Sequence, residues 1–216
     1  MTMRFRTVVF DCDSTLSAIE GIEELAREHR EEVTRLTSLA MSGQVALEEV
    51  YGRRLELIRP SRLDVERIGQ LYIQRLVPAA GETVQNLLAA GVTVQVLSGG
   101  LMPPVAAVAA HLGITRARVA AVDIYFDESG AFAGFDRASL LAQAGGKRRW
   151  LEQWGRELPR PILLVGDGAT DLEARPAVDA FAAFTGVVDR PEVTRHADHV
   201  FPGPSLIDVE RLVLSG

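Results

Sequence analysis

Phe10-Asp11-Cys12-Asp13-Ser14-Thr15 is the stretch that decides the fold, and it directly follows the apolar run Phe5-Arg6-Thr7-Val8-Val9. That run is rich in β-branched residues and predicts a buried strand. Residues two apart in a strand project to the same side, so Asp11 and Asp13 should face one crevice while Cys12 points elsewhere. In an open α/β sheet, ligands bind beyond the carboxyl ends of the strands. By itself, however, Asp-Ser-Thr is equally good material for a turn or a helix cap.

The composition is that of a globular chain with enough apolar residues for a large core. Of the 216 residues, 47% are hydrophobic and 24% are charged, which fits one domain, with or without a small insert. The formal net charge of -6 argues against nucleic-acid and anionic membrane partners, because these require a basic face. A single cysteine, Cys12, excludes an internal disulfide and predicts a buried thiol in a reducing, cytoplasmic compartment.

The region that follows the first strand is predicted to be helical. Between residues 20 and 72, apolar residues recur at helical spacing, and glycine and proline interruptions divide the region into three or four short helices. Ser61, followed three residues later by Asp64, is typical of a capped helix start. A helical insert directly after a strand that carries two aspartates predicts a cap or lid over a site.

From Pro78 onward, helices and strands alternate, which indicates a parallel sheet with crossover helices. The patterns predict strands over residues 92–97, 119–122, 161–165 and 180–184, and a hairpin over 124–135. They predict helices over residues 81–90, from 103 or 104 to 111, over 146–158, and after Pro204. We therefore expect an α/β fold with a Rossmann-like parallel sheet formed by residues 1–16 and 77–216. Residues 17–76 should form a small helical-bundle cap domain inserted after the first strand.

Three of the predicted strands run into polar, glycine-rich turns. The strand 92–97 leads into Ser98-Gly99-Gly100, and the strand 161–165 leads into Gly166-Asp167-Gly168. Glycines let backbone N–H groups approach an anion, and Ser98 adds a hydroxyl donor. Lys147, after Gly145-Gly146, could place an ammonium group beside the same crevice, although a lysine at a helix start is more often exposed.

These residue types together indicate phosphoryl transfer. Asp11, Asp13 and Asp167 form an oxygen-rich set that suits Mg²⁺. The metal and Lys147 would neutralise charge on the phosphoryl oxygens, which leaves a carboxylate free to attack phosphorus. We expect Asp11 to be this nucleophile and to form an aspartyl phosphate. Asp13 would protonate the leaving oxygen and later deprotonate the hydrolytic water.

The order of these motifs resembles that of the haloacid dehalogenase superfamily, and most closely its phosphoserine phosphatase branch. The motifs are Asp11-Cys-Asp13-Ser-Thr, Ser98-Gly-Gly, Gly-Gly-Lys147 and Gly-Asp167-Gly-Ala-Thr-Asp171. Further segments similar to that branch are Glu20-Gly21-Ile22-Glu23-Glu24-Leu25-Ala26, Met41-Ser42-Gly43, Arg54-Leu55, Leu57-Ile58-Arg59-Pro60-Ser61, and Phe184-Thr185-Gly186 with Arg190. The resemblance covers nearly the whole chain and implies a Mg²⁺-dependent hydrolase that releases serine from O-phospho-L-serine.

The resemblance also implies a role for each matching residue. For catalysis, it implies that Asp11 is the nucleophile and that Asp13 is the acid and base. For metal binding, it implies that Asp11, the main-chain carbonyl of Asp13 and Asp167 are the three protein ligands of Mg²⁺, and that Asp171 supports the metal shell. For the phosphoryl group, it implies Ser98 and Lys147 with the main-chain donors of Gly99 and Gly100, and Thr170 and Arg190 beside them. For the amino-acid end, it implies Glu20 against the ammonium group, Arg54 against the carboxylate, and Met41, Ser42 and Gly43 as lining. Without the resemblance, Glu20 and Arg54 would be interpreted as solvated helix residues.

Some positions depart from the family pattern. Leu47 and Leu101 stand where phenylalanine is common, and Ala120-Ala121 replaces a frequent Asn-Arg pair. We expect these changes to alter the substrate pocket and not the transfer chemistry. Two alternatives therefore stay open: a related phosphatase or phosphotransferase for another small phosphomonoester, for example one that transfers to homoserine, and a non-catalytic binding module. The leading expectation is a cytoplasmic monomer or homodimer that binds neither nucleic acid nor membranes.

Overall fold

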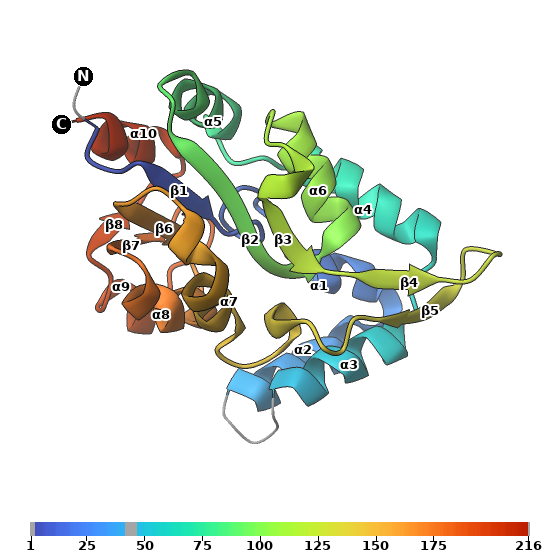
Figure 1. Ribbon diagram of the computed structural model, residues 1–216. Coiled ribbons are helices and arrows are strands. Elements are labelled where there is room, and N and C mark those ends of the chain that lie inside the picture. The colour runs from blue at the N-terminus through green and yellow to red at the C-terminus, as the bar shows by residue number, and fades with distance from the viewer. Residues whose placement is uncertain (1–2, 42–46, 216) are drawn as a thin grey trace.

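The centre of the molecule is a six-stranded parallel sheet, seen in a computed structural model that describes residues 3–41 and 47–215 (Figure 1). Its strands are β1 (Thr7–Phe10), β2 (Thr93–Leu101), β3 (Val119–Val122), β6 (Ile162–Gly166), β7 (Ala180–Phe184) and β8 (His199–Phe201). The spatial order is β3-β2-β1-β6-β7-β8, and every neighbouring pair is parallel. This confirms the predicted α/β class. Because β1 lies between β2 and β6, the three strands that carry polar motifs are neighbours.

Between Gly21 and Gln74, the described residues are mostly helical, as predicted. The helices are α1 (Gly21–Ala26), the short 3-10 helix η1 (Arg27–His29), α2 (Arg30–Met41), α3 (Leu47–Ile58) and α4 (Arg62–Gln74). The backbone N–H of Asp64 donates to the Ser61 hydroxyl at 3.2 Å, and the N–H of Ser61 donates to the Asp64 carboxylate at 3.1 Å. The capping box predicted for the start of α4 is therefore present.

Two adjacent segments of chain connect these helices to the sheet. The Val77 N–H donates to the carbonyl of Leu16 at 3.0 Å, and the Ala18 N–H donates to the carbonyl of Arg75 at 2.8 Å. The outgoing and returning chains thus bond to each other. On the core side, α4 packs closely on α6, because a Cβ built at Gly69 would lie only 3.3 Å from the Cβ of Ala107.

The remaining helices cover the sheet and its edges. They are α5 (Ala80–Ala89), α6 (Met102–His111), η2 (Arg116–Arg118), η3 (Leu140–Ala142), α7 (Gly146–Trp154), η4 (Gly155–Glu157), α8 (Ala169–Ala174), η5 (Arg175–Ala177), α9 (Pro191–Thr194) and α10 (Ile207–Leu214). The predicted hairpin is also present, as β4 (Ile124–Phe126) paired antiparallel with β5 (Phe132–Phe135). Figure 1 shows the hairpin extending away from the sheet beside α3 and α4. Among the described residues, we find no helix that is both long and apolar enough to cross a membrane.

Two predicted elements differ from the structure, and three observed elements were not predicted. Strand β2 does not stop at Leu97, because Leu101 is buried and pairs with Val122 of β3, so the strand continues through Ser98-Gly99-Gly100 with a shift of register. The helix predicted over residues 146–158 ends at Trp154 and is followed by η4. Elements α8, α9 and β8 were not predicted, because segments of three to six residues are too short to show a periodic pattern.

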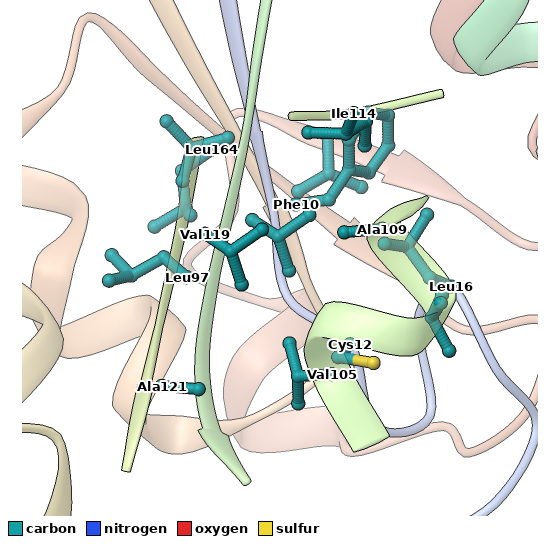
Figure 2. Close-up of a cluster of buried hydrophobic side chains, with 14 of the residues drawn as sticks. Phe10, Cys12, Leu16, Leu97, Val105, Ala109, Ile114, Val119, Ala121 and Leu164 are labelled. Carbon is teal, nitrogen blue, oxygen red and sulfur yellow. The ribbon is translucent and has the colours of Figure 1, made fainter. Parts of the chain in front are cut away.

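The side chain of Cys12 belongs to the hydrophobic core. It is fully buried, and Figure 2 shows it close to Val105 and Leu16, on one side of the strands. Leu97 and Leu164 lie on the other side (Figure 2). The prediction of an unreactive buried thiol is consistent with this packing, and burial raises the pKa of Cys12 further above its usual value.

Candidate active site

A cleft of about 260 Å³ lies between the carboxyl ends of β1, β2 and β6 and the helices α1 and α3. The predicted site residues that line it are Asp11, Asp13, Glu20, Arg54, Gly99, Gly100, Lys147, Asp167, Thr170 and Arg190. Asp11 and Asp13 thus face one crevice, as the strand alternation predicted. Ser98 and Asp171 are fully buried behind the cleft surface. Ser42, Gly43 and the side chain of Met41, which were also predicted for the pocket, lie outside the described residues.

The positions that depart from the family pattern do not line the cleft, as far as the structure describes them. Leu101 is buried in the core, and neither it nor Ala120-Ala121 is among the residues that line the cleft. The side chain of Leu47 is not described. A direct effect of Leu101 and Ala120-Ala121 on the substrate pocket thus stays a prediction, and these residues belong to β2 and β3.

Lys147 joins two carboxylates at the base of the cleft. Its Nζ lies 2.9 Å from Oδ1 of Asp11 and 2.7 Å from Oδ1 of Asp171. The start of α7 packs tightly, because a Cβ at Gly146 would lie only 1.8 Å from the carbonyl oxygen of Leu140. Burial alone would lower the pKa of Lys147, but Asp11 and Asp171 outweigh it and raise that pKa above its ordinary value. The lysine is therefore a buried, charged part of the site and not an exposed residue.

Three aspartates form a cluster that could hold a metal ion. Asp11, Asp167 and Asp171 each offer a carboxylate oxygen, and these atoms lie within 4.8 Å of one another. The close approach requires glycine at position 166, where a Cβ would lie 2.2 Å from the carboxyl carbon of Asp171. Asp171, which the resemblance implied only as a support, is thus close enough to belong to the cluster itself.

The cluster carries more negative charge than its surroundings neutralise. Burial, together with the Asp11 and Asp171 carboxylates, raises the pKa of Asp167 to about 8, although Arg190 forms an ion pair with it. Burial raises the pKa of Asp171 to about 6, against the opposing effect of Lys147. Carboxylate oxygens with excess negative charge are the ligands that hard divalent cations prefer. The residues present therefore fit a metal ion.

Asp13 is held differently from the three clustered aspartates. Its Oδ1 accepts hydrogen bonds from the backbone N–H of Gly21 at 2.7 Å and from the hydroxyl of Tyr72, and its Oδ2 accepts one from Ser98 at 3.3 Å. Burial, followed by the charges of Glu20 and Asp11, raises the pKa of Asp13 to about 7. A carboxyl group that is partly protonated near neutral pH suits a general acid. Tyr72 was not predicted for the site, because its position fits the apolar pattern of α4.

The helical side of the cleft presents the carboxylates of Glu20 and Glu23 and the guanidinium of Arg54. Glu20 accepts a hydrogen bond from the hydroxyl of Ser14 at 2.6 Å and lies 4.0 Å from Arg190, and burial raises its pKa. The guanidinium of Arg54 lies 5.6 Å from the centre of the Tyr51 ring. The Tyr51 hydroxyl in turn donates to the carbonyl of Gly99 at 3.0 Å. The structure thus brings Glu20 and Arg54 into the same cleft as Asp11.

The fold and the site define the class of protein. Residues 5–179 match the haloacid dehalogenase-like hydrolase family. This match spans most of the chain and includes Asp11, Asp13, Lys147 and Asp167. The chain belongs to the haloacid dehalogenase-like hydrolases.

The relatives within that family are phosphoserine phosphatases. The chain is 38% identical over 207 residues to the chloroplastic phosphoserine phosphatase of Arabidopsis thaliana, covering 93% of this chain and 70% of the relative. It is 38% identical over 193 residues to phosphoserine phosphatase of Homo sapiens, covering 88% and 86%. A solved structure described as a phospho-aspartyl intermediate analogue of phosphoserine phosphatase superposes with a TM-score of 0.80 at 26% identity, covering 96% of this chain and 98% of that one.

The surplus of negative charge predicts how the metal-free protein responds to pH. Between about pH 4 and pH 8, folded Asp167 keeps a proton that the unfolded chain releases, so the free energy of unfolding should fall as pH rises through this window. Asp13 and Asp171, whose pKa values are also raised, act in the same direction. In a chelator, the Tm of Asp167→Asn should exceed that of the wild type at pH 8 by at least about 3 °C, and the two should be similar at pH 5.

Thermal unfolding from pH 5 to pH 8.5 checks this expectation. Adding a divalent cation at pH 8 should raise the Tm of the wild type more than that of Asp167→Asn, because the cation binds the folded state. A wild type whose Tm does not change with pH in the chelator, or a variant less stable at pH 8, would contradict the charge surplus.

Proposed function

We propose that the chain is a Mg²⁺-dependent phosphoserine phosphatase that works through an aspartyl phosphate on Asp11. The observation that carries the proposal is that Asp11, Asp13, Lys147 and Asp167 line one cleft, and that Asp11 and Asp167 form a cluster with the buried Asp171. The names of the relatives support phosphoserine as the substrate, and the solved phospho-aspartyl analogue supports the covalent intermediate.

In the first step, a carboxylate oxygen of Asp11 attacks phosphorus, and the bond between phosphorus and the seryl oxygen breaks. Asp13, protonated, gives its proton to that oxygen, so serine leaves as an alcohol. In the second step, Asp13 takes a proton from water as the water oxygen attacks phosphorus. The bond between phosphorus and Asp11 then breaks, which regenerates the carboxylate and releases phosphate.

The phosphoryl oxygens need cationic and N–H partners during both steps. Lys147 is positioned to supply the first, since its ammonium already contacts Asp11 at 2.9 Å. We assign Ser98 and the N–H groups of Gly99 and Gly100 to the same oxygens, with Thr170 beside them. The N–H of Gly100 donates to the Ser98 hydroxyl at 3.0 Å, and substrate binding would exchange this bond for one to phosphate.

Asp11, Asp167 and Asp171 would hold the Mg²⁺, together with the main-chain carbonyl of Asp13 that the family resemblance implies. Their donor set is made of oxygen atoms and carries surplus negative charge, which fits a hard divalent cation. When bound, Mg²⁺ supplies positive charge that stabilises the phosphoryl oxygens in the transition state.

The amino-acid end of phosphoserine requires one anion and one cation, and the helical side of the cleft offers both. We assign Glu20 to the substrate ammonium and Arg54 to its carboxylate, because a guanidinium grips a carboxylate through two hydrogen bonds. We further propose that residues 17–76 act as a cap domain that excludes water from the cleft. The paired connecting segments at Leu16 and Val77 support this division. Cys12, as the only cysteine, supports a cytoplasmic compartment.

Replacing the nucleophile should abolish turnover. We expect Asp11→Asn to lose phosphate release from phosphoserine and to retain no acid-stable label after incubation with ³²P-labelled substrate, because an amide is a poor nucleophile. The matched control is Asp208→Asn, whose exposed carboxylate on α10 pairs with Arg211 and which should behave like the wild type. Labelling of Asp11→Asn at the level of the wild type would contradict an aspartyl phosphate on this residue.

Replacing Arg54 should distinguish phosphoserine from other small phosphoesters. For Arg54→Ala, losing a charge-assisted pair should lower kcat/KM for phosphoserine by about 2–4 kcal/mol, about thirty- to a thousand-fold. Hydrolysis of p-nitrophenyl phosphate, which lacks a carboxylate, should stay within a few-fold of the wild type. Arg53→Ala is the control, since Arg53 is exposed and pairs with Glu49 on the same helix. Equal losses on both substrates would favour a different phosphomonoester, or transfer to an acceptor such as homoserine.

A further inference from the structure

Tyr72 joins helix α4 directly to Asp13. Its ring is buried, with 1% of the residue exposed, and its hydroxyl donates a hydrogen bond to Oδ1 of Asp13. The residue is not among those that line the cleft in the part of the chain that the structure describes. A buried hydroxyl requires a hydrogen-bonding partner, and here that partner is a carboxylate of the active site.

The position of the hydroxyl depends on a glycine on a second helix. A Cβ built at Gly21, the first residue of α1, would lie only 2.1 Å from the Oη of Tyr72. The N–H of Gly21 also donates to Oδ1 of Asp13, at 2.7 Å. The backbone of Tyr72 is also held in place, because its carbonyl accepts a hydrogen bond from the hydroxyl of Ser17 at 3.0 Å. Tyr72 and Gly21 therefore approach one oxygen of Asp13 together.

The two oxygens of Asp13 thus have different surroundings. Oδ1 accepts two hydrogen bonds, from Gly21 and Tyr72, whereas Oδ2 accepts one, from Ser98 at 3.3 Å. An oxygen that already accepts two donors has little room for a proton of its own. The acid proton of Asp13 therefore belongs on Oδ2, the oxygen that accepts from neither Tyr72 nor Gly21.

We propose that Tyr72 is a positioning residue for the general acid: with the N–H of Gly21, its hydroxyl fixes the Asp13 carboxyl so that Oδ2 carries the proton that the leaving oxygen receives. The inference rests on the proposed function, in which Asp13 protonates that oxygen. Both donors come from the helical region 17–76. Alignment of the acid is therefore coupled to the packing of these helices on the sheet, without any contact between Tyr72 and the substrate.

The test is the dependence of rate on the leaving group in Tyr72→Phe. Phenyl phosphate has a basic leaving group that needs a proton, whereas p-nitrophenyl phosphate has a weakly basic one that does not. Losing one hydrogen bond to the acid should lower kcat/KM for phenyl phosphate about tenfold and leave that for p-nitrophenyl phosphate within about twofold. A plot of log kcat/KM against leaving-group pKa, over a series of substituted phenyl phosphates, should therefore be steeper for the variant.

Two controls isolate the hydroxyl of Tyr72. Tyr51→Phe removes another buried hydroxyl of the same helical region, but one that bonds to Gly99 and not to Asp13; whatever its effect on rate, its slope should match the wild type. Asp13→Asn removes the acid itself and should give the steepest slope. If Asp13→Asn keeps the wild-type slope, the proposed function of Asp13 fails. If Asp13→Asn is steep but Tyr72→Phe is not, the inference about Tyr72 is overturned.

A second variant covers the case in which Tyr72→Phe does not fold. Gly21→Ala keeps the tyrosine but places a methyl group where the hydroxyl lies, so it should displace the hydroxyl and steepen the plot in the same way. Thermal unfolding of each variant identifies those that are folded at the assay temperature. A folded Gly21→Ala enzyme with the slope of the wild type would overturn the proposal, as would a Tyr72→Phe enzyme that loses rate equally on all esters.

Discussion

The ion pairs of Lys147 are the interaction on which the site depends. The ammonium bridges Asp11 and Asp171 at 2.9 and 2.7 Å, and all three side chains are buried. Two carboxylates this close repel each other strongly in a poorly solvated interior, and the cation between them offsets that repulsion. Loss of one partner from such a buried arrangement typically costs about 3–5 kcal/mol. The orientation of the Asp11 carboxylate, which directly follows β1, is therefore controlled from α7.

At Asp167, beside the ion pairs of Lys147, negative charge exceeds positive charge. Asp167 has a raised pKa although Arg190 pairs with it, because burial and two other carboxylates act against its ionised form. Such crowding of acids destabilises the metal-free fold and at the same time prepares the oxygen donors for a cation. The same arrangement thus lowers the stability of the fold without metal and raises its affinity for a cation. Such perturbed carboxyl groups are typical of functional sites.

Much of the fold follows from short-range patterns in the sequence. The β-branched run before Phe10 predicts β1, and the alternation of its side chains places Asp11 and Asp13 toward one cleft and Cys12 toward the core, as observed. The capping box at Ser61 and Asp64 likewise depends on residues only three apart. The catalytic motifs could be found because each lies in a contiguous stretch that resembles a known family.

The sequence by itself thus determined the type of most elements, the parallel sheet and the identity of the carboxylates at its edge, since these depend on residues close together in the chain. Only the tertiary structure decided which carboxylates meet. It placed Asp171 within the cluster of aspartates that could hold a metal ion, continued β2 to Leu101 beside β3, and brought the hydroxyl of Tyr72 to Asp13. Each of these contacts joins segments that are distant in the chain, where the packing of helices and strands, and not local periodicity, sets which atoms touch.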